Sequence, residues 1–533
     1  MKGGFRQSMA WLHTWAGLLL GWLLFFIFLT GTAGYFDVEI DRWMRPELPP
    51  PASQVQTVEM LELAVERLRT QAPDAERWRI NLPADRGAVG LSVSWRGSGR
   101  DAAVANGNEQ LDPISGEPLK LRATGGGQLL YKMHYRLHYL PTTISYWLVG
   151  IATMFMLVAI LTGIIVHRKL FTDFFTFRQR KGQRSWLDAH NVLAVMALPF
   201  HVMITYSGLI FFAYIYMAPV ITATYGFGEN SQRLYFDELE GWPAPPKRAN
   251  TPAPLTPLTS LLAEAEAQWG NGRVRSLEIL YPGDSRAQVT ISQAPSGPLR
   301  RIETMVFNGV SGALIEVQSG IPSTPKAIRG VLLGLHEGLF AGPVLRWLYF
   351  LSGLTGTAMI GAGLVLWTVK RRERLKRAGE PSFGLMLVER LNIGTIVGLL
   401  IAIMAYFWAN RLIPVGFDGR VAWEAHAMFI VWAGMLLHPI FRPVQRAWIE
   451  QLWIAAAAYA LLPALNFLTT NRHLGVTLPQ GDWVLAGFDL IMLAFGAAFG
   501  CVAWALSRKA RGTTAKHGSL LSFAAVNKVE PAE

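Results

Sequence analysis

Apolar residues along this chain gather in blocks of about twenty, the length that crosses a bilayer as a helix. We predict eight such spans, at residues 11–36, 142–167, 188–216, 342–369, 391–410, 421–441, 449–468 and 484–507. The pattern therefore predicts a polytopic α-helical membrane protein.

Two long polar segments, at about 37–133 and 217–335, interrupt the first four spans. Each begins with an acidic or Pro-rich linker, and each then has one amphipathic stretch that predicts a helix, at 57–71 and at 256–269. The polar segments are too long to be simple connections between spans, so we expect each of them to fold as a domain outside the membrane.

Short alternating strands are expected after each of these helices, for example at 89–95 and 286–293. Residues 112–117 and 308–312 are typical of turns between two strands of a hairpin. One helix over a small antiparallel sheet makes an α+β module. We therefore predict two small, similar α+β domains inserted between spans.

The basic residues indicate how the chain is oriented. The net charge is +12, and the Lys and Arg residues cluster in short loops beside the spans, notably at 168–184 and 370–377. These loops share one side if the N-terminus is cytoplasmic, as the positive-inside rule predicts. Eight spans then return the C-terminus to the cytoplasm and leave both polar domains outside. This distribution argues against nucleic acid as a partner and for the lipid bilayer.

A repeat relates the first and third spans. His13 in the first span is followed eighteen residues later by Gly31, and His190 in the third span is followed eighteen residues later by Gly208. Repeats of this kind indicate a duplicated structural unit.

The second and fourth spans repeat as well. His134 stands seven residues before Pro141, and His336 stands seven residues before Pro343. Further along these two spans are Gly163 and Gly363. A span–domain–span unit therefore occurs twice, and each copy has one histidine near the cytoplasmic face and one near the outer face. The last four spans lack the pattern.

Histidines in membrane spans are costly and are candidates for function. Haem iron accepts axial imidazoles, and a helix bundle offers the apolar slot that the macrocycle needs. Four histidines at repeated positions therefore predict two bound haems. His201 also belongs to the candidate set, because it follows His190 by eleven residues, about 20° round a straight helix and about 16 Å along it. His138 and His167 are the remaining candidates.

Other interpretations remain open. A single interfacial histidine is often only hydrogen-bonded, and His134 and His138 have the i,i+4 spacing that places two zinc or copper ligands on one helix face. Cys501 is the only cysteine, which excludes a disulfide framework. The sequence has no nucleotide-binding or flavin-binding motif. Electrons for a haem would thus come from a quinol or from a separate cytoplasmic reductase.

The chain resembles the PepSY-associated transmembrane proteins of Gram-negative inner membranes over about residues 5–375. The resemblance rests on Leu-His-Thr-Trp-Ala-Gly, Leu-His-Tyr-Leu-Pro, Asp-Ala-His-Asn, Leu-Pro-Phe-His, Leu-His-Glu-Gly-Leu-Phe-Ala-Gly-Pro and Leu-Trp-Thr-Val-Lys-Arg-Arg. Members include ferric-siderophore reductases that resemble small two-haem b-type cytochromes. The outer modules would then be PepSY-like periplasmic domains.

By motif position, the resemblance implies that His13 and His190 serve a cytoplasmic-side haem b and that His134 and His336 serve an outer one. His201, His138 or His167 could replace one of these. The implied function is that of a transmembrane ferric-chelate reductase, which passes electrons to a periplasmic ferric-siderophore and releases iron(II).

Two functions of other classes compete with this interpretation. One is a non-redox permease or assembly factor for a siderophore or peptide, with histidines that relay protons. The other is a regulator of a periplasmic peptidase. The expected organisation is a first span (1–36), outer domain 1 (37–133), spans two and three (134–216), outer domain 2 (217–335), a fourth span (336–377), four additional spans (378–510) and a tail (511–533).

Overall fold

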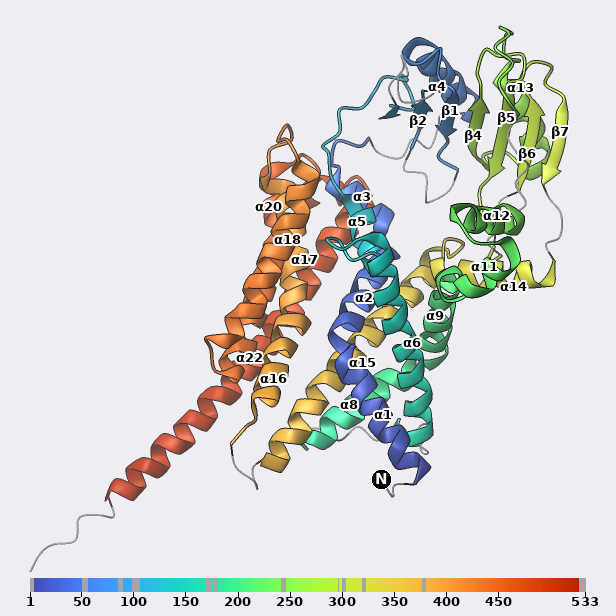
Figure 1. The fold of residues 1–533 in the computed structure, drawn as a ribbon. Coiled ribbons are helices and arrows are strands. Elements are labelled where there is room, and N and C mark those ends of the chain that lie inside the picture. The colour runs from blue at the N-terminus through green and yellow to red at the C-terminus, as the bar shows by residue number, and fades with distance from the viewer. Residues whose placement is uncertain are drawn as a thin grey trace, which may run out of the picture.

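The structure is a computed structural model. It describes residues 4–49, 56–84, 90–97, 106–167, 172, 174–175, 178, 181–240, 246–295, 297–299, 303–318, 323–375 and 380–526, with side chains as far as residue 511. Figure 1 shows three parts: a core bundle of helices in blue to yellow, a second bundle in orange and red beside it, and a sheet domain at one end. Some of the predicted basic residues, such as Arg168 and Lys376, lie outside the described residues.

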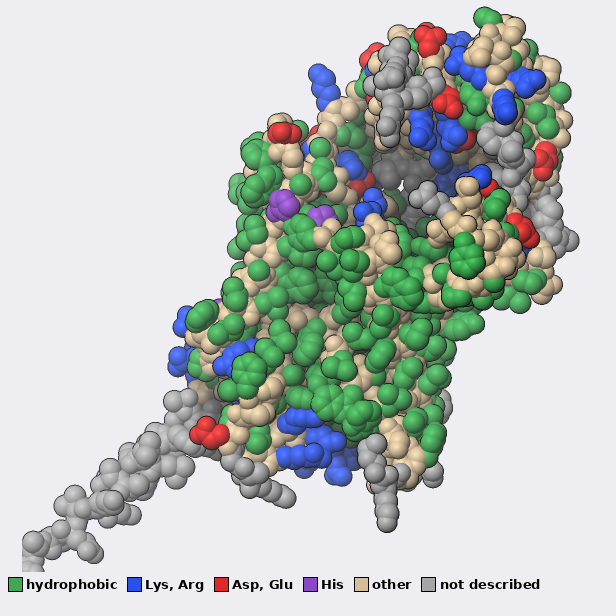
Figure 2. Space-filling model, viewed as in Figure 1, with side chains coloured by type: hydrophobic (Ala, Val, Ile, Leu, Met, Phe, Trp, Pro, Cys, Tyr) green, Lys and Arg blue, Asp and Glu red, His purple; other side chains and the backbone are tan. Residues whose placement is uncertain are grey.

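Within the part of the chain that the structure describes, six helical segments are long and apolar enough to cross a membrane. They are α6 (Thr142–Val166), α15 (Pro343–Leu375), α16 and α17 (Phe383–Ile396, Gly398–Leu412), α18 (Arg420–Leu437) with a short 3-10 helix, α19 and α20 (Val444–Ala460, Leu462–Thr469), and the first part of α22 (Trp483–Val526). Figure 2 shows a broad band of hydrophobic side chains on the bundles, with one cluster of Lys and Arg at the end away from the sheet and others on the sheet domain. The protein is a multi-pass membrane protein.

The first and third predicted spans are both bent. Helices α1 (Phe5–Leu19) and α2 (Gly21–Gly34) meet at 65°, and α8 (Gln183–Met196) and α9 (Leu198–Phe211) meet at 70°. Pro199 explains the second break, since it has no N–H to continue the hydrogen bonds of α8. With each bent pair counted as one span, the described residues contain eight spans, as predicted.

The two outer polar segments form one sheet. Strands β1 (Arg77–Asn81), β2 (Ser92–Arg96) and β3 (Gly107–Gln110) come from the first, and β4 (Val274–Leu280), β5 (Gln288–Gln293), β6 (Thr304–Asn308) and β7 (Leu314–Gln318) from the second. The order is β3-β2-β1-β4-β5-β6-β7, and β1 pairs antiparallel with β4. The two modules therefore share a sheet instead of folding apart.

Helices α4 (Thr57–Gln71) and α13 (Leu258–Trp269) cover this sheet, where helices at 57–71 and 256–269 were predicted. In α4 the buried positions Leu61, Ala64, Val65 and Leu68 follow the i, i+3, i+4, i+7 spacing of an amphipathic helix. They pack with inward strand residues such as Ile80 in one hydrophobic core. The small antiparallel fold expected from the sequence is present.

The two predicted turns have the same hydrogen bonds. The Asp112 carboxylate accepts from the backbone N–H groups of Ile114 and Ser115, each at 2.9 Å. The Asn308 side chain accepts from the corresponding two N–H groups, also at 2.9 Å each. Gly116 and Gly312 close the turns with φ of 73° in both cases, a conformation that glycine adopts without strain.

Two short helices of the first polar segment belong to the bundle. Helices α3 (Asp37–Met44) and α5 (Gly126–Tyr135) bury Trp43 and Met133 in the same core as Phe25 of α2. The corresponding helix of the second half is α14 (Thr324–Glu337). The remaining described helices are α10 (Ala213–Tyr216), α11 (Ala218–Tyr225), α12 (Glu229–Glu240) and α21 (Leu474–Thr477). The membrane part of the fold therefore extends beyond the spans themselves.

Candidate functional site

Four of the candidate histidines form two pairs. The ring centroids of His13 on α1 and His190 on α8 are 6.2 Å apart, and those of His134 on α5 and His336 on α14 are 5.9 Å apart. Two imidazoles that hold one metal ion from opposite sides have their ring centroids about 6 Å apart, since each metal–nitrogen bond is about 2.0–2.1 Å. Each pair takes one histidine from each half of the chain.

One nitrogen of each imidazole is anchored to the protein. The Nδ1 atoms of His13, His134 and His190 lie 2.8, 2.8 and 2.9 Å from the carbonyl oxygens of Ala159, Ile27 and Met359. A carbonyl only accepts, so Nδ1 must carry the proton. Nε2 of each ring therefore keeps its lone pair for a ligand, and the hydrogen bond fixes the orientation of the ring.

His336 is anchored in a related way. Its Nδ1 lies 3.0 Å from the Ser207 hydroxyl, and it also hydrogen-bonds the Ile204 backbone. The Ser207 hydroxyl donates to the Met203 carbonyl at 2.6 Å, so it accepts from His336. The proton is again on Nδ1.

A glycine makes room for each of the four rings. A Cβ at Gly163 would stand 3.2 Å from Cε1 of His13, and one at Gly31 would stand 2.4 Å from Nδ1 of His134. In the second half, a Cβ at Gly363 or Gly208 would stand 3.1 Å from Cε1 of the facing imidazole, which belongs to His190 or His336 respectively. Each bonded carbonyl on Ala159, Ile27, Met359 and Ile204 lies four residues before the facing glycine. One arrangement thus occurs four times.

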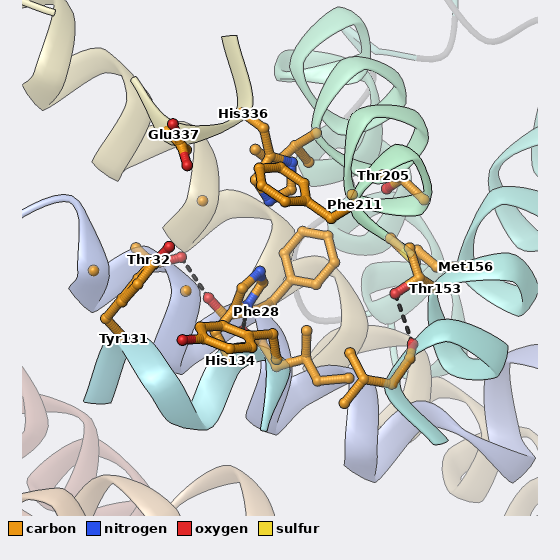
Figure 3. A pocket seen from close by; sticks show the side chains of 18 of the residues that line it. Phe28, Thr32, Tyr131, His134, Thr153, Met156, Thr205, Phe211, His336 and Glu337 are labelled. Carbon is orange, nitrogen blue, oxygen red and sulfur yellow. Dashed lines mark hydrogen bonds between the residues drawn. The ribbon is translucent and has the colours of Figure 1, made fainter. Parts of the chain in front are cut away.

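Each pair opens into its own cavity. The inner cavity has a volume of about 530 Å³ and includes His13 and His190, and the outer one has about 430 Å³ and includes His134 and His336. Figure 3 shows the imidazoles of His134 and His336 on facing walls of the outer cavity. Both volumes lie in the range of small-molecule and cofactor sites.

The two cavities are close neighbours. Leu24 of α2 and Met156 of α6 line both of them. Along α6, Thr153 lines the outer cavity and Gly163 the inner one, a separation of ten residues or about 15 Å. Lys370, Arg371 and Arg374 line the inner cavity, where they suit a ligand that carries carboxylates.

The donor set fits haem iron better than zinc. A structural zinc ion takes four ligands, and the described residues contain no group of three or more His, Cys, Asp and Glu that could hold a metal. Two imidazoles from opposite sides complete the axial positions of a haem. The apolar walls of the two cavities and the available Nε2 atoms suit a flat macrocycle.

The geometry does not support a zinc or copper site formed by His134 and His138. Helix α5 ends at Tyr135, so the two histidines are not on one helix face. The His138 ring stacks on Phe429 at 5.6 Å, with 14° between the planes. His138 does not line the outer cavity.

The stacking of His190 and His201 that was expected for a straight helix is wrong. The 70° bend between α8 and α9 separates the two residues. His201 is buried, lines the inner cavity and places Nε2 3.3 Å from the Ser352 carbonyl, and its ring contacts are to Phe28 and Phe200. His167, at the end of α6, lines the same cavity.

Sequence reasoning missed the spatial assignment of the glycines. Gly31 follows His13 by eighteen residues, yet it faces His134, and Gly163 faces His13 in return. In the second half, Gly208 follows His190 by eighteen residues but faces His336, and Gly363 faces His190. The repeat spacing was the available signal, but it does not say which segments meet.

A comparison with protein families agrees with this description. The sequence model of the PepSY-associated TM region matches residues 10–370, which is more than half of the chain. The match covers both histidine pairs and the sheet, and it ends before the last four spans. No curated protein matches the chain.

Proposed function

Because the chain belongs to the PepSY-associated TM region family, we propose that it is a two-haem membrane reductase that passes electrons to a ferric chelate on its outer side. The observation that supports this most is the pair of matched histidine sites at two depths, each with an anchored Nδ1 and an available Nε2. The repeated span–domain–span unit explains why the two sites are alike.

The residues of the chain have defined tasks in this proposal. His13 and His190 hold the inner haem, and His134 and His336 hold the outer one. A bound haem supplies a one-electron iron couple. Leu24 and Met156 separate the two cavities by a thin apolar layer, which keeps water out and keeps the electron path short.

A polar cavity between the sheet and the bundle is the proposed place for the chelate. It has a volume of about 880 Å³ and opens in the hollow visible in Figure 2. Its lining includes Asp41, Arg45, Asn81, Asn108, Gln128 and Arg275. Gln128 precedes His134 by six residues on α5, about 9 Å along the helix axis. Such a lining suits a hydrophilic ligand rich in hydrogen-bonding groups.

Reduction would release the metal. Oxygen donors such as hydroxamates are hard ligands, and they hold iron(II) more weakly than iron(III). A siderophore of this kind is therefore the substrate class we propose, at a periplasmic face of the inner membrane. The donor is a quinol or a cytoplasmic reductase.

An absorption spectrum of the purified protein tests the haem sites. We expect a dithionite-reduced b-type spectrum with two haems per chain. His13→Ala or His190→Ala should remove one of them, and His134→Ala or His336→Ala the other. His473→Ala, at a short outer helix, is the matched control and should keep both. A folded wild-type protein that binds no added haem would exclude the proposal and favour a permease or a peptidase regulator.

Substrate binding is tested separately with a ferric trihydroxamate and an iron(II)-trapping dye. Arg275→Ala, in the polar cavity, should raise the KM for the chelate several-fold and leave the haem spectrum unchanged. Arg273→Ala is the control, because this residue lies just before β4 and outside the cavity lining. Equal kinetics for both variants would exclude this cavity as the binding site.

A further inference from the structure

The four additional spans are joined to the core by buried charged and polar groups at the outer end of the bundle. Glu424 and Arg420 on α18 form an ion pair at 2.5 Å, and their side chains are 0% and 1% exposed. A fully buried ion pair contributes little net stability, because both charges lose their hydration. The hydrogen bonds that this ion pair makes with the core therefore indicate a role other than stabilisation.

Glu424 accepts four hydrogen bonds, two of them from the core. One carboxylate oxygen accepts from the Thr124 hydroxyl at 2.6 Å and from the Gly125 backbone N–H at 3.2 Å. The other accepts from Asn410 at 2.8 Å and from Arg420. Thr124 and Gly125 directly precede α5. The carboxylate thus binds the N-terminus of that helix, where a negative charge is favoured.

Arg420 and Tyr406 contact the same segment. Arg420 donates to the Ala123 carbonyl at 2.5 Å, and the Tyr406 hydroxyl donates to the Gly126 carbonyl at 2.9 Å. Residues 123–126 are therefore bound one after another by α17 and α18.

Helix α3 packs closely against the same first turn of α5. A Cβ at Gly127 would stand 1.9 Å from the Asp37 carbonyl oxygen, and Gly126 has a φ of 59°. The first turn of α5 can approach α3 this closely only because these positions are glycines. The start of α5 is thus held both by α3 and by the additional spans.

Helix α5 leads directly to the outer site. It has ten residues, and His134 lies eight residues after Gly126, about 12 Å along the axis. A shift or rotation at the start of so short a helix moves the imidazole at its other end. The inner histidines lie on α1 and α8, at the far end of the core bundle from α5 (Figure 1).

We propose that the four additional spans position His134 through Glu424, so that they set the properties of the outer haem and not those of the inner one. This inference rests on the proposed function, since it assumes that His134 is a haem ligand. Glu424 is a positioning residue, which acts on the haem through α5.

The test measures each haem separately in the full-length protein by spectroelectrochemical titration and haem stoichiometry. Glu424→Ala should weaken retention of the outer haem about tenfold or more, the range found for residues that orient a metal ligand. Its midpoint potential should also move, while that of the inner haem stays at the wild-type value. Glu424→Gln keeps the shape of the side chain. It should therefore retain the outer haem better than Glu424→Ala and bring its midpoint potential part of the way back to the wild-type value.

Glu389→Gln is the matched control. Glu389 is a buried carboxylate on α16 that binds Arg372 of α15 at 2.6 Å, and it also joins the additional spans to the core. It does not contact α5, so the outer haem should be unaffected. If Glu424→Ala does not fold, Tyr406→Phe removes one hydrogen bond to Gly126 without removing a charge and should shift the outer haem in the same direction.

The outcomes separate the two proposals. Equal effects on both haems, or no effect of any Glu424 or Tyr406 variant, would overturn the positioning role while leaving the two-haem function intact. An effect of Glu389→Gln on the outer haem as large as that of Glu424→Ala would also overturn it, because general loosening would then explain both. A wild-type protein that binds no haem would reject the proposed function itself, and the positioning role with it.

Discussion

Gly31 lies so close to the imidazole of His134 that a Cβ there would stand 2.4 Å from Nδ1. The same ring nitrogen is bonded to the Ile27 carbonyl, one helical turn before the glycine. The ring therefore packs directly on the backbone of α2, and it can lie there only because Gly31 has no side chain.

Gly31→Ala should displace His134 and weaken retention of the outer haem about tenfold or more. Alanine favours a helix by roughly 1 kcal/mol over glycine, so lower helix stability would not explain a loss. Haem content and the reduced spectrum measure the effect. Gly434→Ala on α18 is the control, because a Cβ there meets no atom within 4 Å and the residue lines neither histidine cavity. Full haem content in Gly31→Ala would show that the ring tolerates displacement.

His201→Ala should keep both haems. The ring of His201 pairs with no other histidine in the described residues, and its Nε2 already faces the Ser352 carbonyl. Removing this buried side chain leaves unfilled space beside Phe28 and Phe200, so we expect a loss of roughly 2–5 kcal/mol in unfolding free energy, as for other large-to-small changes at buried positions. Haem content and thermal unfolding measure the two effects. Loss of a haem from this variant would make His201 a ligand.

Cysteines across the β1–β4 pair should form a disulfide. Arg79 and Glu278 are directly opposed, and opposed residues in an antiparallel pair have Cα atoms about 4.5–5.5 Å apart, which a disulfide can bridge. In a Cys501→Ser background, Arg79→Cys with Glu278→Cys should crosslink on mild oxidation. The pair Arg79→Cys with Thr290→Cys should not, because Thr290 lies one strand further away on β5. A crosslink in the Arg79/Thr290 pair and none in the Arg79/Glu278 pair would mean that the two modules do not share a sheet.

Asp112 should make the stability of the sheet domain fall slightly in acid. Hydrogen bonds from the Ser115 and Ile114 N–H groups lower the pKa of Asp112 below its ordinary value. The folded state therefore gains stability above the unfolded pKa of about 3.9, and this gain disappears as the pH falls through the lower folded value. The effect is small because the carboxylate is only partly buried.

Asp112→Asn should remove this pH dependence, since Asn308 makes the same two bonds in the second turn. Thermal midpoints of the two proteins between pH 2.5 and 6 provide the measurement. If the thermal midpoints of the two proteins change with pH in the same way, Asp112 does not contribute to the pH dependence of stability.

Much of the fold was predictable because the local sequence pattern reflects interactions between residues that are close along the chain. Blocks of apolar residues marked the spans, and the spacing of Leu61, Val65 and Leu68 marked a helix with one buried face. The Asp112 and Asn308 turns were recognisable because their side chains bond their own backbone. The histidine pairs were inferred from repeat spacing and from a family resemblance. The identity of the bound cofactor stays a prediction.

The sequence by itself determined the number of spans, the amphipathic helices, the turns and the matched positions of four histidines. Only the tertiary structure decided that two spans bend, that β1 and β4 join two segments into one sheet, and that Gly31 faces His134 while Gly163 faces His13. It also brought Glu424 to the start of α5. The reason is physical: periodicity and turn chemistry depend on neighbours along the chain, whereas these contacts join residues more than a hundred positions apart that meet only when the helices and strands pack.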